Sequence, residues 1–310
     1  MSTVPLVSIV MCTYNGSSYL DEQLTSIVAQ DYSHFELIIL DDCSTDDTWV
    51  KLLDWQNKHK FITLYKNETN IGYNKNFEKV IQLAKGDYIS IADQDDVWLP
   101  NKISEQAKAL IANPAAILSH CKNVSLIEGK LKYNHTRLWN FFEGDDVRKL
   151  LLYSQFSGHT CLFKKELVDK IIPFPNGIIY DWWLSVNACC NGSIVLVDKV
   201  LIYHRLHQTN ATTINPGKNK TLDLLETLEL FASIKQMSKE GNDFLAQFID
   251  TVKAHNKLEA GKIDWELFRF VFKHRAILFS HRKRAIPLIA HLKYAYKLSK
   301  FNFVNAGNVL

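Results

Sequence analysis

The sequence lacks the marks of several common protein classes. Its six cysteines form no C-x-x-C pair of the kind that zinc and redox sites use, so we expect reduced thiols. The N-terminal segment has no basic stretch ahead of an apolar run, which argues against a signal peptide or a membrane span there. A net charge of +3 is too small to indicate a nucleic-acid partner. These absences favour a cytoplasmic protein that binds no nucleic acid.

Charge is distributed unevenly along the 310 residues. Residues 267–300 contain nine Lys or Arg and no Asp or Glu, so this segment carries +9 and the remainder sums to −6. A hydrophobic content of 47% allows a substantial core. Length and charge together indicate an acidic body followed by a basic C-terminal region.

The first part of the chain alternates short β-branched runs with longer amphipathic stretches. This alternation predicts an α/β fold with a mostly parallel sheet and helices on both faces. The expected strands are residues 6–12, 35–41, 62–66 and 87–93. The expected helices are residues 18–30, 46–59, 73–85 and 99–113, the third with Gly86 as its C-cap.

The pattern changes after residue 115. A Glu128-Gly129 turn between residues 116–127 and 130–134 predicts a hairpin. A helix is expected around residues 181–191, followed by two strands at 193–198 and 200–206. From about residue 218 the pattern predicts helices alone, as an appendage to the sheet.

Acidic residues follow two of the expected strands, where open parallel sheets bind their ligands. The cluster DQDD at 93–96 stays ionised at neutral pH only if a cation or hydrogen-bond donors compensate its charge. Oxygen ligands favour Mg²⁺ or Mn²⁺, and Mg²⁺ usually completes its shell with substrate phosphate oxygens. The cluster therefore predicts a diphosphate-bearing substrate, and a solvated turn capping the next helix is the alternative.

The second acidic segment, DDCSTDDT at 41–48, has two interpretations. Ser44, Thr45 and Asp46 suit the N-terminus of the following helix. Capping does not explain Asp41 and Asp42, which directly follow an apolar strand. One of these carboxylates could accept the N3–H of a pyrimidine base or bind a ribose hydroxyl.

Four segments in order resemble glycosyltransferase family 2, inverting enzymes of the Rossmann-like GT-A fold. They are VSIVMCTYNG, ILDDCSTDDT, residues 67–103 and YDWW. Two positions depart from the family pattern. Cys12 stands where many members have proline, and Tyr180 replaces the acidic residue that often precedes the catalytic base. The resemblance implies a catalytic domain at 1–215, with a nucleotide-binding half at 1–114 and an acceptor-binding half at 115–215. A helical region at 216–310 would follow.

The resemblance implies which residues bind the nucleotide sugar. It places Thr13, Tyr14 and Asn15 at the nucleotide and Asp42 at its base. Asp95 matches the position that faces the ribose.

The resemblance also implies a metal ligand and a catalytic base, each of them a carboxylate. Asp96 would hold Mg²⁺ or Mn²⁺, and Asp181 would be the catalytic base for the acceptor hydroxyl. DQDDVW, SGHTCLF, YDWW and YHRLHQTN resemble a bacterial subgroup that includes rhamnosyltransferases, which implies a dTDP-L-rhamnose donor. His207 matches a histidine near the diphosphate or metal in that subgroup, and a loop histidine without a ligand is the other interpretation.

Four further side chains are candidates on their own chemistry. The faces of Trp182 and Trp183 suit stacking on an acceptor sugar, against the alternative of core packing. Lys75 could reach a donor phosphate or be a solvated lysine. His159, in the SGHT turn, is a candidate for the acceptor site.

The basic C-terminal region suggests where the protein works. Residues 265–279 place apolar side chains around much of a helix with Arg and Lys between them, as in helices that lie on anionic membranes. Peripheral association at the inner face of the cytoplasmic membrane would bring a polyprenyl-linked acceptor within reach. A helical appendage packed on the catalytic domain is the alternative. The expected function is transfer of a sugar to a glycan or lipid-linked acceptor in cell-surface polysaccharide synthesis.

Three other functions fit parts of the sequence. Asp93, Asp95 and Val97 have the DxDxV spacing of haloacid-dehalogenase phosphohydrolases, although that motif normally ends the first strand of its domain. A non-catalytic module that binds nucleotide sugars would need the same acidic residues. A nucleotidyltransferase is disfavoured because no Gly-rich, Lys-bearing loop occurs near the start.

Overall fold

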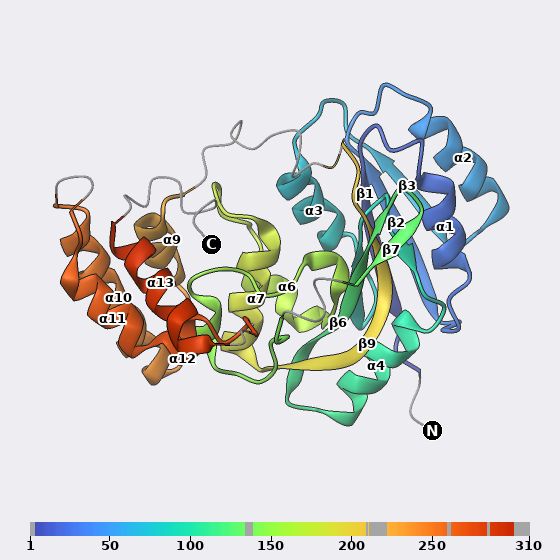
Figure 1. The fold of residues 1–310 in the computed structure, drawn as a ribbon. Coiled ribbons are helices and arrows are strands. Elements are labelled where there is room, and N and C mark those ends of the chain that lie inside the picture. The colour runs from blue at the N-terminus through green and yellow to red at the C-terminus, as the bar shows by residue number, and fades with distance from the viewer. Residues whose placement is uncertain are drawn as a thin grey trace.

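The computed structural model describes residues 4–133, 139–208, 210, 222–258, 262–283 and 286–300. Figure 1 shows the sheet at one end of the molecule and the last helices at the other. The strands are β1 (Val7–Thr13), β2 (Phe35–Asp41), β3 (Ile62–Lys66), β4 (Tyr88–Ala92), β5 (Val97–Trp98), β6 (Ala116–Ile127), β7 (Lys130–Lys132), β8 (Cys161–Lys164) and β9 (Ser193–Arg205). The helices are α1 (Leu20–Val28), α2 (Thr48–Lys58), α3 (Tyr73–Gln82), α4 (Lys102–Ala112), α6 (Val168–Ile171), α7 (Tyr180–Asn191), α9 (Leu224–Phe231), α10 (Lys239–His255), α11 (Trp265–Lys273), α12 (Arg275–Leu278) and α13 (Pro287–Lys300).

The strands form one mixed sheet in the order β3-β2-β1-β4-β8-β6-β9-β5, with β7 paired to β6. The first four strands of the chain run parallel to one another. β8 then pairs antiparallel to both β4 and β6, which joins the parallel half to the second half. The predicted α/β fold, its parallel N-terminal sheet and the β6–β7 hairpin are confirmed.

Helices cover both faces of the sheet. The residues of β1 therefore alternate between two cores, and the strand is buried on both sides. Val7, Ile9 and Met11 point into a core with the apolar faces of α1, α2 and α4. Val10 points into the other core, which includes apolar residues of α3, α7 and the C-terminal helices. Burial on both faces explains why the strand is almost continuously apolar.

Two local predictions were wrong. Helix α3 ends at Gln82, and Gly86 is not its C-cap. A Cβ atom at Gly86 would lie 2.6 Å from the Leu6 carbonyl oxygen and the Ser8 nitrogen, so glycine is needed there for close approach to β1. The expected strands at 193–198 and 200–206 are one strand, β9, whose register against β6 shifts at Lys122, as at a β-bulge.

One strand, in the segment after DQDD, was not predicted. The short strand β5 lies between this segment and α4 and pairs antiparallel with Ile202 and Tyr203 of β9. This pairing ties the end of β9 to the acidic segment. It could not be inferred from a run of only two residues.

The described residues from 222 onward form helices joined by loops, as predicted, with an isolated β-bridge from Arg282 to Trp139. Asp223, Ser238 and Asp264 cap α9, α10 and α11 through their side chains. Within the described part of the chain, every helix is too short or too polar to span a bilayer.

Candidate active site

The carboxyl ends of β1, β2 and β4 lie side by side, because β1 pairs in parallel with both other strands. Thr13 and Asp41 end their strands, and the Thr13 hydroxyl donates to Asp41 Oδ1 over 2.9 Å. The hydroxyl and N–H of Ser44 also donate to Asp41. Asp41 is therefore fully engaged in shaping the loop after β2, which leaves Asp42 as the carboxylate to consider for a ligand.

Asp42 fixes the loop before α3 against the end of β2. Its Oδ1 accepts hydrogen bonds from Asn67 Nδ2 at 2.8 Å and from the Ile71 N–H at 2.9 Å. Its Oδ2 accepts from the Gly72 N–H at 2.9 Å. The side chain orders the loop at this edge of the sheet, and contact with a nucleotide base stays a prediction.

The loop after β1 is held by hydrogen bonds to the loops that follow β4 and β2. The Tyr14 N–H donates to Gln94 Oε1 and its carbonyl accepts from Gln94 Nε2, at 2.9 and 3.1 Å. Asn15 has a φ of 47°, a conformation that asparagine tolerates better than most residues, and its Oδ1 accepts from the Thr45 N–H. Tyr14 is left 47% exposed, so it is available to a ligand.

Asp93, Asp96 and His159 form a carboxylate–imidazole cluster. Their ligand atoms all lie within 4.8 Å of one another. His159 Nδ1 is 3.0 Å from Asp93 Oδ2 and 3.8 Å from Asp96 Oδ2. Asp96 is fully buried, and its Oδ2 has no hydrogen-bond partner among the described residues. Such an oxygen is costly unless a cation or proton occupies it, and two carboxylates with one imidazole suit Mn²⁺ or Mg²⁺.

The pKa values of the carboxylate–imidazole cluster reflect its crowded charge. Burial raises the pKa of Asp96 to about 8, and the charges of Asp93 and Asp95 add to this, whereas His159 opposes it. Burial would lower the pKa of His159, but the two carboxylates of the cluster outweigh it and raise that pKa to about 9. The cluster therefore holds protons that a divalent cation would displace.

Asp95 points to a different partner. Its Oδ2 lies 2.8 Å from His207 Nε2 and 3.3 Å from Asn210 Nδ2. The His207 ring packs on Tyr19, with ring centres 4.6 Å apart. The sequence placed His207 with the metal and His159 with the acceptor, whereas the structure has His159 in the carboxylate–imidazole cluster and His207 on Asp95.

Arg205, which the sequence analysis did not single out, joins Asp95 and Asp96 of the acidic segment to β9. Its backbone N–H donates to Asp96 Oδ1 at 3.1 Å, and its Nε donates to the Asp95 carbonyl oxygen at 2.8 Å. Its guanidinium also pairs with Glu22 and lies 4.8 Å from the centre of the Tyr19 ring. The arginine in the YHR segment could have been noticed in the sequence as a candidate site residue. Its contact with the acidic segment depends on the β5–β9 pairing, which the sequence does not reveal.

Asp181 lies in the first turn of α7 and is partly exposed, although its Oδ1 is buried without a hydrogen-bond partner among the described residues. Burial raises the pKa of Asp181 to about 6. Hydrogen bonds from the N–H groups of Gly158 and Trp182 favour the charged form and partly oppose this rise in pKa. The charges of His159 and Asp93 also act on this carboxyl group. Gly158 directly precedes His159 in the chain, so the predicted base lies near the carboxylate–imidazole cluster.

The sequence model of the family named Glycosyl transferase family 2 matches residues 8–172, which contain β1 to β4, the acidic segment and His159. The chain belongs to this family. It is therefore a glycosyltransferase, and the resemblance found in the sequence is confirmed at the level of the family.

Two curated relatives agree with this family. The putative teichuronic acid biosynthesis glycosyltransferase TuaG of Bacillus subtilis (strain 168) is 32% identical over 269 residues, which are 86% of this chain and 88% of TuaG. An Escherichia coli relative, UDP-Glc:alpha-D-GlcNAc-diphosphoundecaprenol beta-1,3-glucosyltransferase WfgD, is 26% identical over 213 residues, 67% of this chain and 80% of WfgD.

Solved structures agree on the fold. S. aureus TarS 1-349 in complex with UDP-GlcNAc superposes with a TM-score of 0.63 at 17% identity, over 94% of this chain and 90% of that one. The mannosyltransferase PcManGT from Pyrobaculum calidifontis, in complex with GDP-Man and Mn2+, gives a TM-score of 0.58 at 17% identity, over 99% and 84% of the two chains. The predicted GT-A fold is confirmed.

Other predicted residues of this glycosyltransferase are engaged elsewhere. Trp182 Nε1 donates to the Leu150 carbonyl oxygen and Trp183 Nε1 to that of Ile171, and both rings pack on Phe231 of α9. This placement favours core packing over sugar stacking.

Lys75 is also held by protein groups. Its ammonium donates to Glu78 Oε2 at 3.0 Å and to the Phe174 carbonyl oxygen at 3.2 Å. A phosphate contact would require the side chain to leave both acceptors, so the donor-binding role of Lys75 stays a prediction.

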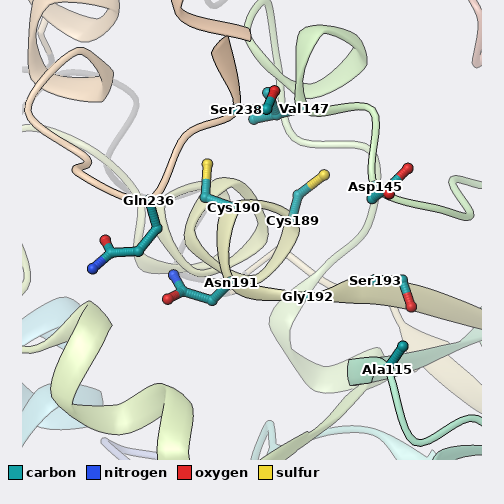
Figure 2. A pocket seen from close by; sticks show the side chains of 10 residues that line it. All are labelled: Ala115, Asp145, Val147, Cys189, Cys190, Asn191, Gly192, Ser193, Gln236 and Ser238. Atoms are coloured by element: carbon teal, nitrogen blue, oxygen red, sulfur yellow. The ribbon is translucent and has the colours of Figure 1, made fainter. Parts of the chain in front are cut away.

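The surface of the described residues includes a large groove and a smaller hollow. A groove of about 790 Å³ lies against Tyr19, Arg205 and His207, beside the turn of the β6–β7 hairpin. A smaller hollow of about 420 Å³, shown in Figure 2, lies at the far end of α7 and is lined by Cys189, Cys190 and Gln236 among others. The groove adjoins the Asp95–His207 pair, so it is the better candidate for substrate.

Proposed function

We propose that this chain is an inverting hexosyltransferase that moves a sugar from a nucleoside diphosphate donor to a hydroxyl group of a glycan or lipid-linked saccharide. The observation that carries the proposal is the proximity of Asp181, a partly exposed carboxyl with a raised pKa, to the carboxylate–imidazole cluster. Inverting transfer needs a base for the acceptor and compensation of charge on the leaving diphosphate. These two groups supply both needs.

Asp93, Asp96 and His159 would hold Mn²⁺ or Mg²⁺ through their side chains. When bound, the cation neutralises negative charge on the departing diphosphate. Arg205 positions this site, because its backbone fixes Asp96 and its side chain fixes the backbone of Asp95. His207, which contacts Asp95, then borders the groove in which we place the donor.

Asp181 accepts the proton of the acceptor hydroxyl as the hydroxyl oxygen attacks the anomeric carbon. The new carbon–oxygen bond forms on the face opposite the diphosphate, and the bond to the diphosphate oxygen breaks. A single displacement inverts the anomeric centre, and the nucleoside diphosphate leaves with the bonding electron pair. Asp181 ends the step protonated and returns its proton to solvent.

Relatives support the class of acceptor. The name of WfgD describes transfer to a sugar on diphosphoundecaprenol, and that of TuaG describes teichuronic acid biosynthesis. We therefore propose a lipid-linked or polymeric acceptor and a role in cell-surface polysaccharide synthesis. For the donor, the subgroup resemblance supports dTDP-L-rhamnose, whereas the names of WfgD and the TarS complex support a UDP-hexose.

A donor screen tests the function. Purified protein with Mn²⁺ is incubated with dTDP-L-rhamnose, UDP-hexoses and GDP-mannose, and release of nucleoside diphosphate is measured with and without an undecaprenyl-diphosphate-linked sugar. We expect acceptor-dependent release from one pyrimidine nucleotide sugar. A response to a UDP-hexose alone would replace the rhamnose assignment, and release of phosphate from simple phosphomonoesters instead would support a phosphohydrolase.

The pH profile of transfer should report the ionisation of Asp181. A base must be deprotonated to act, and the pKa of Asp181 is raised to about 6, so kcat/KM should fall about tenfold per pH unit below pH 6. An aspartate with an ordinary pKa would stay active to about pH 4. The measurement is kcat/KM between these pH values at saturating Mn²⁺, and a constant value down to pH 5 would contradict the assignment.

A further inference from the structure

Helix α13 carries an apolar face that the described part of the chain leaves uncovered. Leu288, Ile289, Leu292 and Tyr296 are 52%, 61%, 39% and 42% exposed. At 100° per residue they fall within an arc of about 100° of the helix surface. We refer to these four residues as the apolar stripe of α13. Scattered exposed apolar residues are ordinary, but four on one arc of one helix indicate an interaction surface.

Lysines border the apolar stripe. Lys293, Lys297 and Lys300 follow it around the helix, at about 120° to 180° from Leu288 by the same geometry. Residues 267–300 contain nine basic and no acidic residues, so no carboxylate of this segment offsets the charge. An apolar strip next to a lysine strip is the pattern of helices that lie in the headgroup region of an anionic bilayer.

The face of α13 that borders the apolar stripe on the side away from the lysines packs on α11. Ala295 and Leu298 of α13 are buried, as are Leu267 and Val271 of α11, and the Asp264 N–H donates to the Ser299 carbonyl oxygen. The apolar residues expected to lie on a membrane, at 265–279, therefore pack largely inside the helical group. The side chains available to a bilayer belong mainly to α13.

We propose that the apolar stripe of α13 and its three lysines bind the surface of a bilayer rich in anionic phospholipids. Charge complementarity selects this occupant, because a protein partner of ordinary composition would give no reason for lysines along one side of the stripe. Trp265, which is 58% exposed, lies beside the C-terminal end of α13 and adds an aromatic side chain of the kind found at bilayer interfaces. Delivery to a lipid-linked acceptor rests on the proposed function, whereas membrane binding does not.

Co-sedimentation of the full chain with vesicles tests the proposal. Vesicles of phosphatidylglycerol with phosphatidylcholine should bind the protein, vesicles of phosphatidylcholine alone should bind it weakly, and salt should weaken binding. Neutralising the three lysines should lower the partition coefficient by about 100-fold, since each lysine near an anionic surface contributes about a factor of five. A second variant changes Leu288→Gln, Ile289→Gln and Leu292→Gln, and it should lose binding to a similar extent.

A matched control carries three glutamines on other helices, at exposed apolar positions of α2 and α4. It changes Val50→Gln, Leu53→Gln and Ile111→Gln, which are 60%, 40% and 57% exposed. The control should bind vesicles as the parent does. Three outcomes would overturn the proposal. The stripe variant could bind vesicles as well as the parent, the parent could fail to bind them at low salt, or the parent could form a dimer that the stripe variant abolishes. Nucleoside diphosphate release is measured in the same variants. It tests the proposed transferase activity separately from membrane binding, so failure of one proposal can be told from failure of the other.

Discussion

Replacing Asp181 by asparagine is expected to lower kcat/KM for transfer by about 10³-fold, within the range that a positioned general base contributes. The change removes proton acceptance and keeps the size of the side chain. Donor affinity should stay within a few-fold of the parent, because the proposed donor contacts lie at the carboxyl ends of β1, β2, β4 and β9 and not on α7. The measurements are nucleoside diphosphate release for rate and thermal shift for donor binding.

The matched control for Asp181 is Asp169→Asn on α6, where the carboxylate is exposed. This variant should keep the parent rate. A loss of less than tenfold in Asp181→Asn, with folding and donor binding intact, would remove Asp181 from the chemistry. A non-catalytic binding module would show that result.

The second large effect is expected at Asp96. Asp96→Asn should weaken Mn²⁺ binding by about 100-fold and lower kcat by about 10² to 10³-fold at fixed metal, because it removes a charged ligand and leaves an amide in a buried site. Calorimetric titration with Mn²⁺ measures the first effect without any substrate. Transfer kinetics over a range of Mn²⁺ concentrations measure the second.

Asp54→Asn, at an exposed position of α2, is the control for Asp96. It should bind Mn²⁺ as the parent does. If Asp96→Asn binds Mn²⁺ with unchanged affinity, the cation site lies elsewhere. The unpaired Oδ2 of Asp96 would then need another explanation.

The sequence predicted the first half of the fold well because its signals are local. Strands β1 to β4 are apolar runs bounded by polar loops, and their ends carry the residues of the family motifs. A parallel sheet brings such ends to one edge without further information. Thr13, Tyr14, Asn15 and Asp42 could therefore be placed together before any coordinates were known.

The roles of the two histidines could not be predicted in the same way. His159 reaches Asp93 and Asp96 because the 3₁₀ helix at Gly158–Thr160 precedes β8, which pairs with β4. His207 reaches Asp95 because β9 pairs with β5. Both contacts join residues far apart in the chain through strand pairs that local patterns do not specify.

The C-terminal helices illustrate a second limit. Periodicity identified the apolar residues of 265–279 but not which of them would be covered. Leu267 and Val271 are buried, while Ile289 on α13 is 61% exposed. Which helix covers which depends on tertiary packing, so the surface offered to solvent emerges only in three dimensions.

The most direct measurement is a crystal structure with Mn²⁺ and the nucleoside diphosphate of the accepted donor, with Mn²⁺ located by anomalous scattering. We predict an anomalous peak bonded to Asp96 and next to Asp93 and His159, with the diphosphate oxygens on the ion and Asp181 facing the space beyond the diphosphate. A peak bonded elsewhere while these three side chains hold no ion, or a diphosphate bound away from Asp181, would contradict the account.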